Sequence, residues 1–175
     1  MDNLEVKRVT PKDIDQLQKI AAQTFSETFS SRNTKENMKI YLEERLSIEK
    51  LTIELNNKES EFYFGTINNS TIGYLNLNFG SSQTELKDEK AVEIERIYVL
   101  NEFQGKKIGQ ILFEKATQIA KQKNGSYLWL GVWRVNKRAI NFYKKNRFSE
   151  FDKHIFKLGN EEQIDIMMRL PLEDS

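Results

Sequence analysis

Apolar positions recur along the chain with two different spacings, and each spacing predicts a different kind of element. Spacings of three and four residues are typical of amphipathic helices, and they run through 11–25, 33–55, 106–123 and 136–145. The polar stretch 33–55 is long enough for one or two helices. Short β-branched and aromatic runs, separated by turn residues, predict strands instead. We expect these strands at 4–8, 62–64, 72–77, 92–100, 127–132, 148–158 and 163–170.

The order of these elements predicts the fold class. Asn68 and Asn69 form the turn of a hairpin, and Gly159 and Asn160 form the turn of a second one. Between the hairpins, the strand–helix–strand segment at 92–132 requires a crossover, which is expected to be parallel and right-handed. With no linker or repeat in the sequence, we expect one α/β domain over 1–175, with a central mixed sheet of about seven strands flanked by helices.

Charge and hydropathy limit the kinds of partner that we expect the protein to bind. The net charge of +1 gives no basic excess, so no nucleic-acid partner is expected. The total conceals an acidic stretch at 81–95 and a basic one at 134–147. No apolar run is long enough to cross a membrane, and no basic segment followed by an apolar one opens the chain. These features predict a soluble, cytoplasmic protein without a membrane partner.

The absence of cysteine and the single histidine exclude several kinds of chemistry. There can be no thiolate nucleophile, disulfide or Cys-ligated metal site. A multi-histidine metal site is excluded as well, and Ser-His-Asp chemistry would have to use His154. We therefore expect no metal.

The segment 93–110 carries the most informative pattern, a strand that runs through a short loop into a helix. The loop contains Gly105 and two lysines, and Gly109 stands early in the helix. Free backbone N–H groups at a helix start, together with the helix dipole, bind anions, so a phosphate is the expected ligand. The spacing matches neither a P-loop nor a G-x-G-x-x-G loop. An ordinary surface turn remains the alternative at this point.

Two acids, Glu93 and Glu95, occur in the strand before this loop. Because side chains alternate along a strand, both should lie on one side, and the same alternation continues to Ile97 and Val99. Such a pair indicates either a functional use of the carboxylates or a solvated strand end. A bulge could divert them to solvent.

Two motifs in this order resemble a known family. Ile97-Tyr98-Val99 followed by 104–109 is similar to the strand and Gln-x-x-Gly-x-Gly loop of the GCN5-related N-acetyltransferases (GNAT), with Lys107 in place of the middle glycine. The segment 136–148 resembles the family's Asn-x-x-Ala-x-x-Phe-Tyr-x-x-x-Gly-Phe helix, with Arg147 in place of its glycine. Over the whole chain the sequence looks most like the bacterial PaiA-type spermidine/spermine N-acetyltransferases.

The resemblance implies a GNAT fold, acetyl-CoA as acetyl donor and a primary amine as acceptor. It implies direct transfer, with Glu93 or Glu95 as the base that deprotonates the amine and Tyr143 as the acid that meets the departing thiolate. The strand at 93–99 is expected to diverge from the one at 127–132 and to pair with the pantetheine arm. The implied cofactor contacts are Ile97, Tyr98, Val99, Gly105, Lys106, Lys107, Ile108, Gly109, Gln110, Asn136 and Tyr143.

The acceptor is expected to be a small-molecule amine, most of all a polyamine, because the acidic stretch 81–95 can attract a polycation. Two alternatives stay open: an enzyme that acetylates a protein N-terminus or lysine, and a CoA-binding regulatory module without catalysis. A homodimer is compatible with the sequence, which does not define the oligomeric state.

Overall fold

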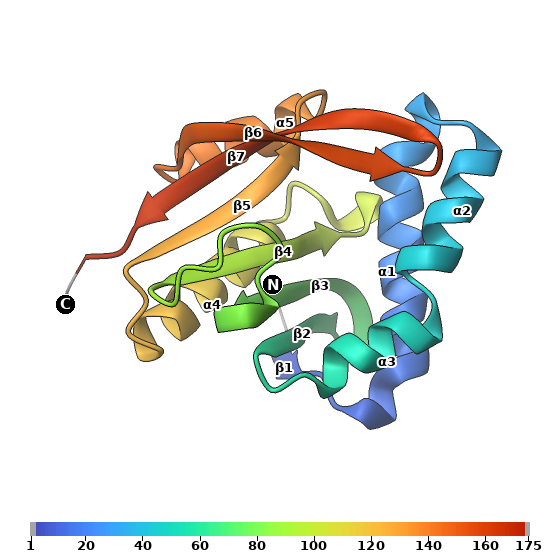
Figure 1. Cartoon of the computed structure of the whole chain (residues 1–175). Coiled ribbons are helices and arrows are strands. Elements are labelled where there is room, and N and C mark those ends of the chain that lie inside the picture. The colour runs from blue at the N-terminus through green and yellow to red at the C-terminus, as the bar shows by residue number, and fades with distance from the viewer. Residues whose placement is uncertain (1–2, 174–175) are drawn as a thin grey trace.

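The computed structural model describes residues 3–173, which form one seven-stranded sheet with helices on both faces (Figure 1). The strand order is β1-β2-β3-β4-β5-β7-β6. The strands are β1 (Leu4–Arg8), β2 (Ser60–Ile67), β3 (Ser70–Phe79), β4 (Ala91–Val99), β5 (Tyr127–Trp133), β6 (Ser149–Leu158) and β7 (Glu161–Pro171). The α-helices are α1 (Ile14–Phe29), α2 (Lys35–Arg45), α3 (Ile48–Asn56), α4 (Ile108–Gln122) and α5 (Lys137–Lys145).

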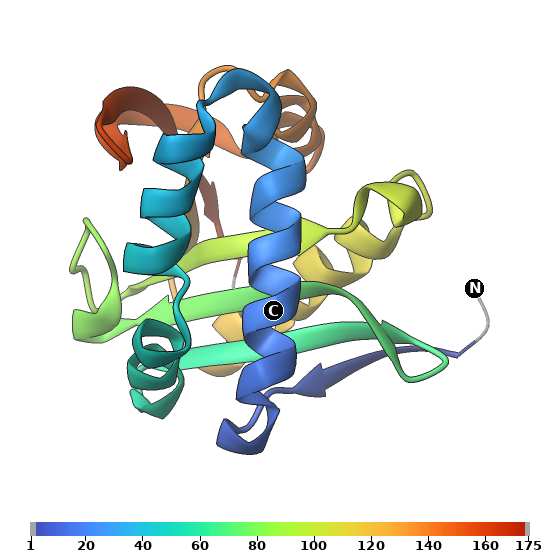
Figure 2. The ribbon, with the colours of Figure 1, turned by 90° about the vertical axis from the view of Figure 1, so that its right-hand side faces the viewer.

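Two hydrophobic cores separate the helices into layers. On one face, the apolar stripe of α4, with Ile108 and Leu112 fully buried, packs on side chains of β3, β4 and β5 such as Leu77. On the other face, α1 contributes Leu17 to a core that contains Phe62 of β2. Figure 2 shows α1 crossing in front of the central strands with α2 and α3 beside it. The amphipathic spacing of each helix therefore decides which face it covers.

The sheet opens in its middle, between β4 and β5. The two strands are parallel, as expected for the crossover through α4, but they pair only from Ala91 to Glu93 of β4 and from Tyr127 to Trp129 of β5. Beyond that point β5 continues to pair with β7 along its whole length. Figure 1 shows β4 and β5 diverging. The rest of β4 therefore has a neighbouring strand on its β3 side only.

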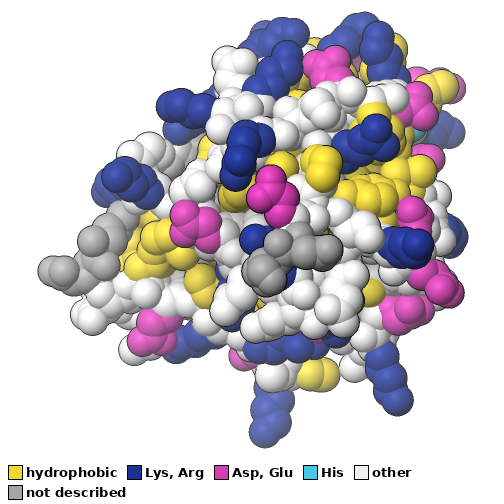
Figure 3. Space-filling model, turned by 90° about the vertical axis from the view of Figure 1, so that its left-hand side faces the viewer, with side chains coloured by type: hydrophobic (Ala, Val, Ile, Leu, Met, Phe, Trp, Pro, Cys, Tyr) yellow, Lys and Arg dark blue, Asp and Glu magenta, His cyan; other side chains and the backbone are white. Residues whose placement is uncertain are grey.

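The predicted mixed α/β sheet, its seven strands, both hairpins and the parallel crossover are confirmed. The stretch 33–55 forms two helices: α2 ends at Arg45 with Leu46 as its C-cap, and the Ser47 side chain caps α3 by accepting a hydrogen bond from the Lys50 amide. Within residues 3–173, no helix is both long and apolar enough to cross a membrane, and no three His, Asp or Glu side chains are grouped as metal ligands. On the face in Figure 3, acidic and basic side chains are interspersed.

Candidate active site

A cavity of about 1130 Å³ lies where β4 and β5 separate. Its walls come from β4, β5, the start of α4, α5 and β6, and from α1 and α2 on the opposite face. Every site residue expected from the sequence lines this cavity except Lys106. The ammonium of Lys106 instead lies 5.4 Å from the centre of the Phe103 ring. The residues predicted to bind the cofactor and the predicted catalytic residues therefore line one cavity, and Lys106 is the exception.

The open edge of β4 presents backbone groups to this cavity. The amide of Leu100 donates to the carbonyl of Ile72 in β3, at 2.9 Å. Because successive residues of a strand direct their N–H and C=O groups to opposite sides, those of Ile97 and Val99 face the gap left by β5. The Val99 carbonyl already accepts a hydrogen bond from the side chain of Gln104, at 3.2 Å. An extended ligand with amide groups can add here as a further strand.

The loop into α4 forms a cradle of free amides. Within residues 3–173, the backbone N–H groups of 105–110 donate to no acceptor. A Cβ atom added at Gly105 or Gly109 would have no neighbouring atom within 4 Å, so no other group of the protein fills the space beside either glycine. The space beside them is free for a close ligand, and the positive end of the α4 dipole favours an anionic one.

The two departures from the family motifs, Lys107 and Arg147, both have left-handed backbone conformations. Lys107 has φ 66° and caps α4, and Arg147 has φ 71° directly after α5. A non-glycine residue in this conformation costs about 1 kcal/mol. The chain thus keeps the backbone path that a glycine would adopt freely, and Lys107 contributes its amide to the cradle regardless of its side chain.

Side chains of α5 and its flanks connect the two walls of the cavity. Asn136 caps α5 with its side-chain oxygen, which accepts from the Ala139 amide at 3.2 Å. Arg138 donates to the side-chain oxygen of Gln104, at 2.6 Å, and so joins α5 to the loop after β4. The side chains of Asn146 and Gln110 are also hydrogen-bonded, at 3.0 Å, which ties the end of α5 to the start of α4.

A β-bulge places the two acids of β4. Asn76 pairs with Arg96 and Leu77 with Ile94, so Glu95 is an extra residue without a partner on β3. Glu93 and Glu95 do lie together, because one donor, Asn78 Nδ2, reaches both carboxylates. The expected continuation of their alternation is wrong, however. The extra residue shifts the pattern by one, and Ile97 and Val99 pack toward the α4 face instead.

Glu93 is almost fully enclosed, with 3% of its surface exposed. Thr84, in the loop between β3 and β4, donates to it twice, from its amide at 2.8 Å and from its hydroxyl at 2.6 Å. Burial and the adjacent charge of Glu95 raise the pKa of Glu93 to about 7, while the hydrogen bonds from Thr84 and Asn78 act in the opposite direction. Glu93 can therefore exchange a proton near neutral pH.

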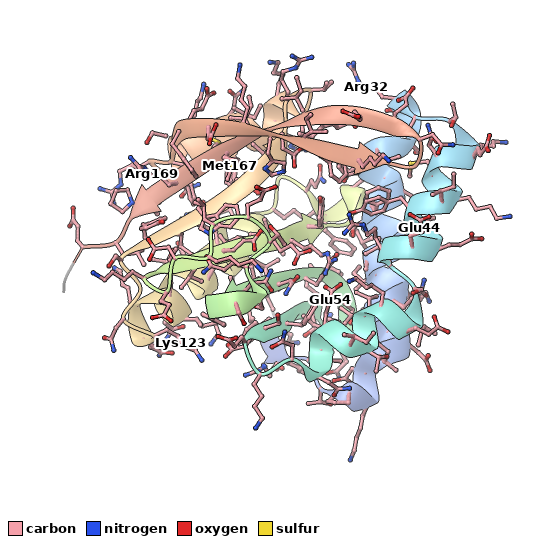
Figure 4. All side chains as sticks on the ribbon, in the orientation of Figure 1. Arg32, Glu44, Glu54, Lys123, Met167 and Arg169 are labelled. Carbon is pink, nitrogen blue, oxygen red and sulfur yellow. The ribbon has the colours of Figure 1, made fainter. Side chains whose placement is uncertain are left out.

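Glu95 has a different electrostatic environment, because it pairs with Arg96 at 3.1 Å. The guanidinium of Arg96 is buried and also contacts Glu54 at 2.6 Å and the side-chain oxygen of Asn76 at 3.0 Å. Glu54, labelled in Figure 4, reaches it from α3. Burial lowers the pKa of Arg96, but these carboxylates outweigh it and hold that pKa well above its usual value. The guanidinium in turn stabilises the negative charge of Glu95.

Tyr143 projects from α5 into the same cavity and is itself buried. Burial is the cause that raises the pKa of its hydroxyl far above the ordinary value. The hydroxyl therefore keeps its proton at neutral pH and can donate a hydrogen bond to a group in the cavity.

Sequence reasoning missed the aromatic wall opposite α4. Phe25 of α1 stacks on Tyr41 of α2 with ring centres 4.1 Å apart, and Phe29 lies 4.9 Å from Trp133 of β5. Phe156 of β6 approaches Tyr41 at 5.7 Å. Each residue fits an ordinary core position in its own segment, so only the tertiary structure shows that their elements converge. Thr84 and Asn78 were also missed, because only the tertiary structure brings them to Glu93.

Comparison with known proteins decides the family. A model of the acetyltransferase (GNAT) family matches residues 14–148. The chain belongs to this family. It is therefore an N-acetyltransferase of the GNAT type, and acetyl-CoA is the acetyl donor in this family.

Individual relatives cover nearly the whole chain. An uncharacterised N-acetyltransferase from Lactobacillus delbrueckii, encoded in the pepI 3′ region, is 36% identical over 172 residues, which is 98% of this chain and 99% of that protein. A spermidine N(1)-acetyltransferase from Thermoplasma acidophilum is 28% identical over 86% of this chain and 91% of its own length. Among solved structures, the PaiA N-acetyltransferase of T. acidophilum in complex with coenzyme A has the same fold. Its TM-score is 0.80, with 24% identity over 97% of this chain and 99% of that one.

Proposed function

We propose that this GNAT protein transfers an acetyl group from acetyl-CoA directly to a primary amine of a polyamine such as spermidine or spermine. The observation that carries the proposal is the position of Glu93. Its carboxylate is buried, has a pKa of about 7 and lies in the cavity at the point where β4 separates from β5. A base there can meet an amine beside the open edge of β4.

The fit for acetyl-CoA is supported by three features of the cavity wall. The backbone groups of Ile97 and Val99 can pair with the amides of the pantetheine arm. The amides of 105–110 can receive the pyrophosphate, beside glycines whose Cβ positions are open. Tyr98, Asn136 and Tyr143 line the remaining wall. Bound acetyl-CoA supplies an activated acetyl thioester.

Deprotonation of the acceptor falls to Glu93. An alkyl amine has a pKa of about 10 and arrives as an ammonium ion, which has no lone pair for attack. Glu93, in its charged form, takes one proton from that ammonium, directly or through one water. The amine nitrogen then forms its bond to the acetyl carbon. The carboxylate of Glu95, paired with Arg96, can stabilise the approaching cation.

The bond between the acetyl carbon and sulfur breaks as the new C–N bond forms. The departing thiolate accepts a hydrogen bond from the Tyr143 hydroxyl and takes its proton, while the nitrogen, which must lose a second proton to become an amide, returns a proton to Tyr143. The chain has no cysteine, so an acetyl-cysteine intermediate cannot form. The proposed direct transfer requires donor and acceptor to be bound together.

A polyamine acceptor is supported by the acidic side chains on the acceptor side of the cavity. Glu85, Glu93, Glu95 and Asp165 all line it. The aromatic rings of Phe25 and Tyr41 can cover the aliphatic segments of a polyamine and interact with its cationic groups. The T. acidophilum relative that carries the name of a spermidine acetyltransferase supports the same acceptor class.

The test is a panel of acceptors supplied with acetyl-CoA at fixed concentration. Initial rates of CoA release are measured with spermidine, spermine, butylamine and a lysine-containing peptide. The proposal expects the highest kcat/KM with spermidine or spermine. Activity on the peptide alone would establish the protein acetyltransferase instead. CoA binding without release by any amine would establish a binding module.

A further inference from the structure

The only histidine of the chain lines the cavity and faces carboxylates from two other segments. His154 belongs to β6, and its Nε2 is 3.4 Å from a carboxylate oxygen of Asp165 in β7. Its Nδ1 is 3.9 Å from a carboxylate oxygen of Glu85, in the loop between β3 and β4. Within residues 3–173, this Nδ1 is enclosed by protein yet makes no hydrogen bond.

Gly131 of β5, which has no side chain, leaves room for the contact between His154 and Asp165. A Cβ atom at Gly131 of β5 would lie 3.1 Å from Cε1 of His154 and 3.3 Å from a carboxylate oxygen of Asp165. Glu85 directly follows Thr84, which holds Glu93, so the base and the histidine are connected by two adjacent residues of one loop. The imidazole therefore lies beside the proposed transfer site.

The charges that act on His154 are carboxylates. Asp165 acts on it through a hydrogen bond and its charge, and Glu85 and Glu93 act through their charges. Their sum raises the pKa of His154 above its usual value, although partial burial opposes this. Its positive charge offsets one of the two negative charges of Asp165 and Glu85.

We propose that Asp165 and Glu85 bind a second ammonium group of the acceptor, and that His154 occupies this subsite as an internal cation until it loses its proton. The inference rests on the proposed function, because it identifies the acceptor as an amine with at least two cationic groups. Two cations cannot share the two carboxylates without strong repulsion. Acceptor binding and proton release from His154 are therefore coupled.

The coupling is reciprocal, which gives it two measurable signs. A diamine that binds at the subsite must lower the pKa of His154, and protonation of His154 must weaken diamine binding. If one proton is released per diamine bound, the affinity for the diamine falls up to about tenfold per pH unit below the pKa of His154. A monoamine leaves the subsite empty and shows neither effect.

The first experiment is an NMR titration of the untagged protein, in which His154 gives the only histidine signal. The pH dependence of its imidazole C–H shift is recorded alone, with 1,4-diaminobutane and with butylamine. We expect a lower His154 pKa with the diamine and an unchanged one with butylamine. An unchanged titration curve with the diamine, or an equal shift with both amines, overturns the inference.

The second experiment compares kcat/KM for the two amines from about pH 6 to 8. Titration of Glu93 affects both substrates and cancels in their ratio, which is expected to rise with pH in favour of the diamine. His154→Gln should make this ratio independent of pH. Lys153→Gln, an exposed neighbour on the same strand, should retain the rise. A rise that persists in His154→Gln contradicts the subsite.

Two further readouts separate this inference from the proposed function. Asp165→Asn should reduce the preference for the diamine over butylamine, and an unchanged preference would count against the subsite even if His154→Gln failed to fold. If neither spermidine nor spermine were acetylated, the proposed function would fail, while the NMR titration would still decide whether a diamine binds beside His154.

Discussion

Glu93 and Glu95 share one hydrogen-bond donor, the side-chain amide of Asn78, at 3.1 and 2.7 Å. The two carboxylates nevertheless differ in charge behaviour. Glu95 has the Arg96 guanidinium beside it, whereas Glu93 is buried with the charge of Glu95 as its neighbour, which raises its pKa. Two carboxylates in different surroundings can have different tasks. Glu93 suits proton transfer, and Glu95 supplies the negative charge that raises the pKa of Glu93.

The first prediction concerns Glu93→Gln. Because the variant has no base, kcat/KM should fall about 10²- to 10⁴-fold, and the dependence of kcat/KM on a group with pKa of about 7 should disappear. In the unaltered enzyme, the rate rises with pH through that value, since the carboxylate must be deprotonated. The measurement is a pH–rate profile at saturating acetyl-CoA with butylamine as acceptor, because this monoamine leaves the His154 subsite empty.

The matched control is Glu61→Gln. Glu61 is another buried carboxylate, in β2, and it pairs with Lys123 and with the Tyr63 hydroxyl rather than lining the cavity. This variant should lose stability but keep the shape of the pH profile. A Glu93→Gln enzyme within tenfold of the unaltered rate would show that Glu93 is not the base.

A second prediction separates the roles of the two acids. Glu95→Gln removes the negative charge that raises the pKa of Glu93, and it leaves the Arg96 charge less compensated. Both changes favour the charged form of Glu93. The rising limb of the pH profile should therefore move to lower pH. A limb that stays in place or moves to higher pH would refute the coupling between the two carboxylates.

Tyr143→Phe tests the acid. The loss of the hydroxyl should reduce kcat about 10²-fold or more and leave acetyl-CoA binding nearly unchanged, since the ring still fills its place. Isothermal titration with acetyl-CoA and steady-state kinetics provide the two readouts. Tyr127→Phe, which removes a hydroxyl that donates to Asp88 outside the cavity, is the control and should retain full kcat. Unaltered kcat in Tyr143→Phe would assign the proton to another donor.

Arg147→Gly tests the strain at the end of α5. Arg147 has φ 71°, and a glycine adopts this conformation without steric cost. The variant should gain about 1 kcal/mol of unfolding free energy, which corresponds to a rise in Tm of about 2–4 °C for a chain of this size. Arg147→Ala keeps the Cβ atom and should give no such gain. Equal stability of the two variants would indicate that the conformation is not strained.

Local patterns in the sequence predicted most of the fold. The β-branched and aromatic runs of β2 and β3 and the stripe from Ile108 to Ala120 each lie within a single element, and each element forms as expected. The strand–helix–strand order at 92–132 was sufficient to predict the parallel pairing of β4 with β5. The motifs of the resembled family identified the loop at 104–110, most of which lines the cavity.

The rest depended on geometry that no local pattern contains. The extra residue Glu95 shifts the alternation of β4, and a bulge leaves no mark in the spacing of apolar residues. The pKa of Glu93 depends on burial and on Thr84, which a separate loop contributes. The contact of His154 with Asp165 and Glu85 joins three segments. The sequence shows that His154 is the only histidine, but it does not show which residues lie beside it.

The most direct test of acetyl transfer uses acetyl-CoA with a labelled acetyl group and measures where the label goes. The unaltered enzyme is incubated with spermidine and, separately, without any acceptor, and both protein and small molecules are analysed by mass spectrometry. We predict labelled N-acetylspermidine in the first reaction and unmodified protein in both. Labelled protein that accumulates without acceptor, or the absence of an acetylated amine, would contradict direct transfer from acetyl-CoA to the amine.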